Sequence, residues 1–225
     1  GNNRIRGLAS DGVLPGPVPG RTLRLSPSGG FTRAFISGRP TGLPIREPDL
    51  VQLGSRIDTE KGRVTIETGT PSGTVRTANV TSGQFAIEQP VGPIETTFRL
   101  TAPMNGCRPF EGGGGSGSAA KKVAGKATKS SRPIASAAKQ KKKKPKRKRR
   151  SRKIFVQSDG GHRTSGRYSD AIVRGTQWTI QDYCTNTRVT VREGLVEVFD
   201  QVKRKSVLVP AGERYISRLK KPRKR

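Results

Sequence analysis

The sequence has 225 residues, of which 30% are hydrophobic and 5% aromatic, and its formal net charge is +29. This apolar content is too low for one well-packed core of that length, and it favours two small cores with disordered spacers. No run of about 18 apolar residues occurs, so we expect no membrane-spanning helix. The charge predicts an anionic partner such as nucleic acid, lipid head groups or a cell-envelope polymer.

Residues 1–20 are rich in Gly and Pro, and we expect a flexible N-terminal segment. From residue 21 onward, short stretches of alternating apolar and polar residues predict β-strands. TLRL and FTRAFI both alternate and flank PSGG, a pattern typical of a hairpin. In RVTIE, the side chains of Val64 and Ile66 share one face of a strand. These patterns predict a first β module over residues 21–110.

Residues 111–153 differ in composition from the rest of the chain. This segment begins with a Gly/Ser-rich stretch and ends with the basic run KQKKKKPKRKRRSRK, residues 139–153. Only Gln140, Pro145 and Ser151 interrupt the Lys and Arg of this basic run. Its composition predicts a disordered and extended linker, because the charges repel and little apolar surface is available to bury.

Strand patterns resume at Ile154 and predict a second β module over residues 154–218, followed by a basic tail over residues 219–225. We therefore expect an all-β fold of two small antiparallel modules, sandwich- or solenoid-like, joined by a disordered basic linker. GSRIDTEKGRVTIE in the first half also resembles GTQWTIQDYCTNTRVTVR in the second, which is consistent with a duplication.

The segment AIVRGTQWTIQDYCTNTRVTVREGLVEVFD, followed by SVLVPAGERYISR, resembles the FecR domain. LVQLGSRIDTEKGRVTIET is similar to the repeated extracellular FecR-like modules of actinobacteria. The resemblance covers roughly residues 45–110 and 165–218. It implies an all-β module outside the cytoplasm with no enzymatic activity. Regulators with this domain also carry a sigma-factor-binding segment and a transmembrane helix, which this sequence lacks, so a signalling role is not carried over.

The basic run has three interpretations. It is a tether with generic polyanion affinity, a dedicated nucleic-acid element, or a nuclear-import type of signal. Base-specific recognition is disfavoured, because no fold or aromatic residue within the run would direct a side chain at a base edge. The residues we predict to bind polyanions are Lys141, Lys142, Lys143, Lys144, Lys146, Arg147, Lys148, Arg149 and Arg150.

The sequence predicts no catalytic, cofactor or metal site. His162, the only histidine, lies in a turn-like stretch where we expect exposure, and Asp182, Glu193 and Glu197 are expected to face outward. We expect Trp178 to anchor a core. Cys107 and Cys184 are too few for a disulfide scaffold, and their spacing makes no zinc site, which leaves two alternatives: two buried free thiols, or a disulfide that links the halves.

These observations predict a non-enzymatic, secreted or envelope-associated FecR-like module. Its partner would be an anionic polymer, with an unidentified envelope protein or glycan as a further partner and no small-molecule substrate. The alternative is an intracellular protein that binds nucleic acid through the same basic run. The chain starts at Gly1 and its only Met is Met104, so we expect either a removed leader or a fragment.

Overall fold

The structure is a computed structural model that describes residues 15–36, 41–89, 95–107, 150–173 and 175–219. These residues form an all-β fold, and none of them is helical. The strands of the first half are β1 (Thr22–Phe35), β2 (Leu43–Pro44), β3 (Asp49–Gln52), β4 (Arg56–Gly69), β5 (Val75–Thr81), β6 (Gln84–Glu88) and β7 (Thr96–Leu100). Those of the second half are β8 (Ser151–Ser158), β9 (His162–Ser165), β10 (Ser169–Val173), β11 (Thr176–Tyr183), β12 (Asn186–Glu193), β13 (Leu195–Asp200), β14 (Lys205–Pro210) and β15 (Arg214–Arg218).

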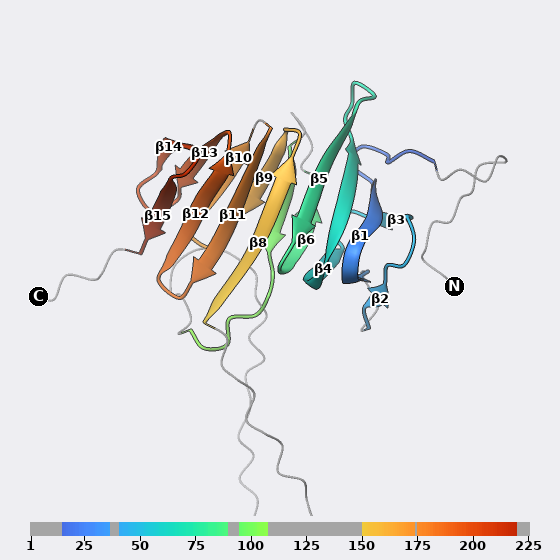
Figure 1. Ribbon diagram of the computed structural model, residues 1–225, viewed down its shortest axis with the longest axis horizontal. Helices are drawn as coiled ribbons and strands as arrows, with labels where there is room; N and C mark the ends of the chain where they lie inside the picture. The colour runs from blue at the N-terminus through green and yellow to red at the C-terminus, as the bar shows by residue number, and fades with distance from the viewer. Residues whose placement is uncertain (1–14, 37–40, 90–94, 108–149, 174, 220–225) are drawn as a thin grey trace, which may run out of the picture.

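All described strands belong to one hydrogen-bonded sheet, in the order β14-β13-β10-β9-β7-β6-β4-β5-β8-β11-β12-β15. Off this path, β1 pairs with β4, and β2 and β3 pair with β1. The sheet folds over into two layers. In Figure 1, β5, β8, β11, β12 and β15 form the layer nearer the viewer, and β6, β9, β10 and β13 lie behind them. The sheet passes from one layer to the other along β4, because residues 56–58 of this strand pair with β6 and residues 63–69 pair with β5.

The two halves of the sequence are hydrogen-bonded to each other at two places. β5 pairs with β8 in antiparallel fashion, and β7 pairs with β9 in parallel. At the far end of the sheet, the Tyr215 hydroxyl on β15 donates a 2.9 Å hydrogen bond to Asp200 on β13. The two ends of the strand order therefore lie close together, and the sheet is nearly closed.

The hydrophobic core fills the space between the layers and is shared by both halves. Along β11, and along β12 up to Val191, buried positions alternate with half-buried ones, and the buried side chains of this alternation point into the core. Trp178, which the sequence predicts to be buried, is fully so, and its indole nitrogen donates a 3.0 Å hydrogen bond to Thr164 Oγ1 across the core. Other fully buried core side chains are Leu23, Leu25, Ile57, Val64, Ile66, Phe85, Ile87, Phe98, Ile154, Val156, Ile180, Val189, Val196 and Val198.

The hairpin predicted from TLRLSPSGGFTRAF is wrong, because these residues form the single long strand β1. β1 bends at two register shifts, between Pro27 and Gly29 and between Phe31 and Arg33, and stays paired with β4 on both sides of the bends. Gly30 has φ of 65°, and a Cβ there would collide with the Lys61 carbonyl oxygen. Glycine therefore permits a bend against β4 where the sequence pattern predicted a turn.

Two further boundaries differ from expectation. β8 begins at Ser151, so the last three residues of the predicted linker belong to the sheet. β9 lies in a stretch whose sequence predicts a turn, and it pairs with β7 on one side and β10 on the other. The rest of the predicted linker up to residue 149, the first 14 residues and the tail from residue 220 lie outside the described residues.

Candidate functional site

Of the residues predicted to bind polyanions, only Arg150 belongs to the described part of the chain, and it is exposed. Lys141, Lys142, Lys143, Lys144, Lys146, Arg147, Lys148 and Arg149 lie outside the described residues. Arg150 immediately precedes β8, so the basic run joins the fold at the start of that strand. Lys153, the last residue of the run, is exposed on β8.

Cys107 and Cys184 are joined by a disulfide bond, with a Cα–Cα distance of 5.1 Å. Cys107 follows β7, and Cys184 sits in the turn between β11 and β12. The bond therefore links the two halves, which is the second of the alternatives that the sequence left open for these cysteines. The carbonyl oxygen of Arg150 lies 3.8 Å from Cys184 Sγ, so the disulfide adjoins the point where the basic run enters the sheet.

The basic tail leaves the fold at the same end of the sheet. Ser151, at the start of β8, is opposite Tyr183, at the end of β11. Arg218, at the end of β15, is opposite Asn186, at the start of β12. The Leu219 amide then donates a 2.9 Å hydrogen bond to the Thr185 carbonyl in the β11–β12 turn. The run that precedes Ser151 and the tail that follows Leu219 thus attach within one short turn of each other, next to the disulfide.

The outer surface of β8, β11, β12 and β15 carries further basic residues, and we call it the arginine face. Its cations come from outward positions of three strands: Lys153 on β8, Arg188 and Arg192 on β12, and Arg214 and Arg218 on β15. The sequence analysis missed these residues, although RVTVR and RYISR each place two arginines four residues apart. In a strand, that spacing puts their side chains on one face.

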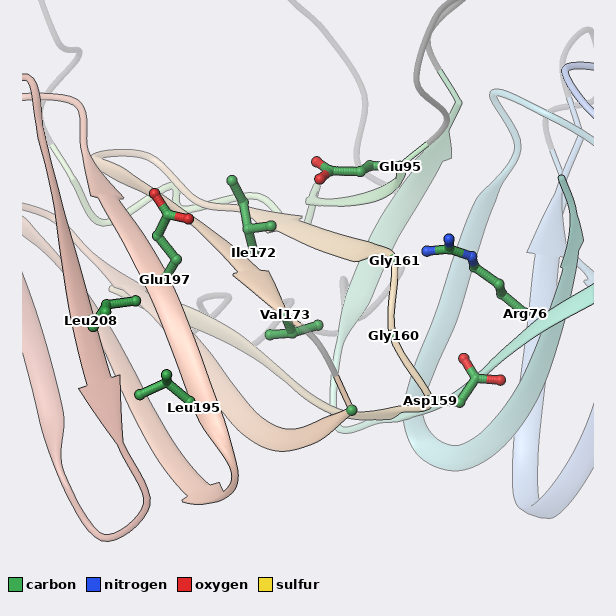
Figure 2. A pocket seen from close by; sticks show the side chains of 11 residues that line it. Arg76, Glu95, Asp159, Gly160, Gly161, Ile172, Val173, Leu195, Glu197 and Leu208 are labelled. Carbon is green, nitrogen blue, oxygen red and sulfur yellow. The ribbon is translucent and has the colours of Figure 1, made fainter. Parts of the chain in front are cut away.

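A cleft of about 1300 Å³ lies on the other side of the molecule, over β10, β13 and β14 (Figure 2). Its right-hand part in this view holds Arg76 and Asp159, and its left-hand part holds Leu195 and Leu208. The full lining is Arg76, Glu95, Asp159, Gly160, Gly161, Ile172, Val173, Gly175, Leu195, Glu197 and Leu208. None of these described residues carries a hydroxyl, thiol or imidazole group, so the lining itself supplies no nucleophile of that kind.

His162 was expected to be exposed, and the structure corrects that expectation, because the residue is fully buried. Its Nδ1 lies 2.5 Å from Ser158 Oγ, and its ring stacks on Phe98 with centroids 5.3 Å apart. Burial lowers the pKa of His162 to about 4, with a smaller contribution in the same direction from the charge of Arg76. The imidazole is therefore neutral at neutral pH. Because Ser158 is also buried, this pair acts as a packing element between β8 and β9.

Asp182 was expected to face outward, but it is fully buried at the end of β11. Its carboxylate pairs with Arg152 Nε at 2.9 Å and accepts hydrogen bonds from the Arg167 amide at 2.8 Å and from Thr187 Oγ1 at 2.6 Å. These partners satisfy the buried charge, so Asp182 fastens the loop before β10 to the β11–β12 hairpin. Glu193 and Glu197 lie at exposed positions, as expected.

Within the described residues, no cluster of His, Cys, Asp and Glu side chains has the arrangement of a metal site. The same part of the chain contains no helix with the length and apolar character needed to cross a membrane. Comparison with known proteins found no matching family model, no matching curated protein and no matching solved structure.

Proposed function

We propose that this protein is a non-enzymatic, exported FecR-like module of the cell envelope or extracellular space that binds an anionic polymer through its basic segments. The observation that carries the proposal is the convergence of those segments. The basic run attaches at Arg150 and the basic tail at Leu219, both beside the β11–β12 turn. Positive charge brought together at one end of a rigid sheet raises the local attraction for a polyanion.

The Cys107–Cys184 disulfide supports the exported location over the intracellular alternative, because disulfides persist in oxidising compartments and are rare in the cytosol. The resemblance of residues 45–110 and 165–218 to FecR domains points to the same location. Intact mass after alkylation, measured on protein isolated from its native cells, tests this part. Retention of the disulfide supports export, whereas alkylation of both cysteines would favour the intracellular alternative.

Binding is tested with heparin, poly(glycerol phosphate) and duplex DNA over a range of salt concentrations. A generic polyanion binder should bind all three, and the logarithm of its binding constant should fall linearly with the logarithm of the salt concentration. The variant K141Q/K142Q/K143Q/K144Q should show a shallower salt slope. Absence of binding at low salt would contradict the proposal. A strong preference for one DNA sequence that persists at about 0.3 M salt would replace it with the nucleic-acid alternative.

The proposal includes the two-module arrangement, with a basic tether that ends where β8 begins at Ser151. Limited trypsin digestion tests it, since a tether should be cut first and leave two β-rich fragments that stay joined by the disulfide until it is reduced. Protection of residues 141–149 in the free protein would argue against a tether.

A further inference from the structure

We propose that the arginine face is itself a binding surface, and that it takes an extended, hydroxyl-rich polymer carrying phosphate or sulfate groups. This inference rests on the proposed function and specifies its ligand. The basic run and tail supply attraction that does not depend on the shape of the polymer. The arginine face adds fixed positions for anionic groups and neutral polar side chains between them.

The arginines of this face form a regular ladder. Arg218 is opposite Asn186, and Arg214 is opposite Thr190, and directly paired residues of antiparallel strands point to the same side of the sheet. Arg188 and Arg192 occupy the alternate positions of β12. Along the strand direction from Asn186 to Arg192, the arginines come in the order Arg218, Arg188, Arg214 and Arg192, so they alternate between β15 and β12. Each step is two residues, or about 7 Å along the strand direction.

Two of these guanidinium groups are held over aromatic rings. The Arg192 guanidinium lies 5.0 Å from the centroid of the Phe155 ring, and that of Arg188 lies 5.3 Å from the centroid of the Tyr183 ring. A cation over an aromatic face gains electrostatic attraction and loses some of its freedom before any ligand arrives. Less side-chain entropy then has to be lost on binding, which favours the capture of anions at defined positions.

The outward positions of the described β8, β11, β12 and β15 hold a single carboxylate, Glu193 at the end of β12. Glu193 is opposite Gln177 and accepts a hydrogen bond from its side-chain amide, while the other acid of these strands, Asp182, is buried. None of the cations of the face is ion-paired with a carboxylate in the described part of the chain. The opposite layer differs, because outward positions of β10 and β13 there hold Asp170 and Glu197 together with apolar side chains.

The neutral residues of the face indicate the chemistry of the polymer. Amide and hydroxyl side chains lie between and beside the arginines, where they would hydrogen-bond to the hydroxyl groups of a sugar or polyol. These residues are Gln157, Gln177, Thr179, Gln181, Asn186 and Thr190. Phe155 and Tyr183 are the aromatic residues of the face, and arginines already lie over both rings. Binders of single-stranded nucleic acid rely on uncovered aromatic rings on which bases stack, and the described part of the arginine face offers no such ring.

The test compares two variants of the full-length protein that each lose four positive charges: R188Q/R192Q/R214Q/R218Q on the face and K141Q/K142Q/K143Q/K144Q in the basic run. Fluorescently labelled dextran sulfate, poly(glycerol phosphate) and single-stranded DNA of matched charge serve as probes. The face variant should lose about tenfold more affinity than the run variant for the two hydroxyl-rich polymers, and no more than the run variant for DNA.

Equal losses in both variants for every polymer would overturn the inference and leave the proposed function standing. A larger loss for DNA in the face variant would also overturn it, in favour of a nucleic acid as the occupant. Failure of the unaltered protein to bind any probe would remove the proposed function itself. The double variant R214Q/R218Q provides a second test if Arg188 or Arg192 proves necessary for folding, since no ring contact involves Arg214 or Arg218 in the described structure. It should show the same selective loss at smaller magnitude.

Discussion

Cys107 and Cys184 are 77 residues apart in the sequence and covalently joined in the fold. Cys107 follows the back-layer strand β7, and Cys184 lies in the turn that connects two strands of the front layer. The bond closes a loop that contains the entire basic run. It also fixes the turn from which both the run and the tail depart. Its position connects the stability of the fold with the placement of its most basic segments.

Replacing both cysteines, as in C107S/C184S, should lower the free energy of unfolding by about 4 kcal/mol. The reason is that the loop of the unfolded chain is no longer closed, and the chain-entropy relation gives this magnitude for a loop of such length. Urea unfolding of the variant and of the unaltered protein, with and without a reducing agent, measures it. The reduced unaltered protein should match the variant. A loss below about 1 kcal/mol in both would contradict the prediction.

A second prediction concerns the hydrogen bond between Trp178 and Thr164, which crosses the core between the two layers. The substitution T164V keeps the volume of the side chain but removes the acceptor, so the buried indole N–H is left unpaired. We expect a loss of about 1–3 kcal/mol in urea unfolding followed by tryptophan fluorescence. T179V, at an outward position of β11 next to Trp178, is the control and should change stability by less than about 0.5 kcal/mol. Similar losses in the two variants would show that the hydrogen bond is not the cause.

The strands of the second half were predictable because their alternation is strong. Val189 and Val191 in β12, and Val196 and Val198 in β13, mark the inward face directly. The burial of Asp182 was also present in this pattern, since it lies two residues beyond Ile180 on the inward side of β11. Its charge led to the opposite prediction. Arg152, Arg167 and Thr187 offset the cost of burying this charge through an ion pair and hydrogen bonds, and the first two residues lie outside the β11–β12 hairpin.

Other features depend on contacts that no local pattern contains. β9 has the sequence HRTS, which shows no apolar alternation, and it becomes a strand by pairing with β7 and β10. His162 is buried for the same reason. The arginine face likewise requires the register between β12 and β15, because only that register sets Arg214 and Arg218 alternately with Arg188 and Arg192.

A third prediction follows from the buried carboxylate of Asp182. The substitution D182A leaves Arg152, the Arg167 amide and Thr187 without their acceptor, and it should cost about 3 kcal/mol of stability. E197A removes the same charge from an exposed position of β13 and should change stability by less than about 0.5 kcal/mol. Chemical denaturation of both variants measures the difference. Equal stability of the two would mean that the network around Asp182 contributes nothing net.

The last prediction concerns pH. The unfolded imidazole of His162 titrates near its usual pKa of 6.5, whereas in the folded protein burial lowers this pKa to about 4. Between these two values the unfolded state binds more protons than the folded state, so stability should fall as the pH is lowered through this window. The stabilising effect of the neutral imidazole is complete above pH 6.5. It should be lost by about pH 4, with a total change of about 3 kcal/mol.

Because His162 is the only histidine of the chain, few other side chains titrate between pH 6.5 and 5. Urea unfolding of the unaltered protein and of H162F at several pH values isolates its contribution, since phenylalanine retains a ring to stack on Phe98 but has no group that titrates. The free energy of unfolding of H162F should stay nearly constant from pH 6.5 to 5, while that of the unaltered protein declines. NMR titration of the imidazole protons in the folded protein gives the pKa directly. A folded-state value near 6.5, or parallel pH profiles for the two proteins, would refute the prediction and show that protonation of His162 does not oppose folding.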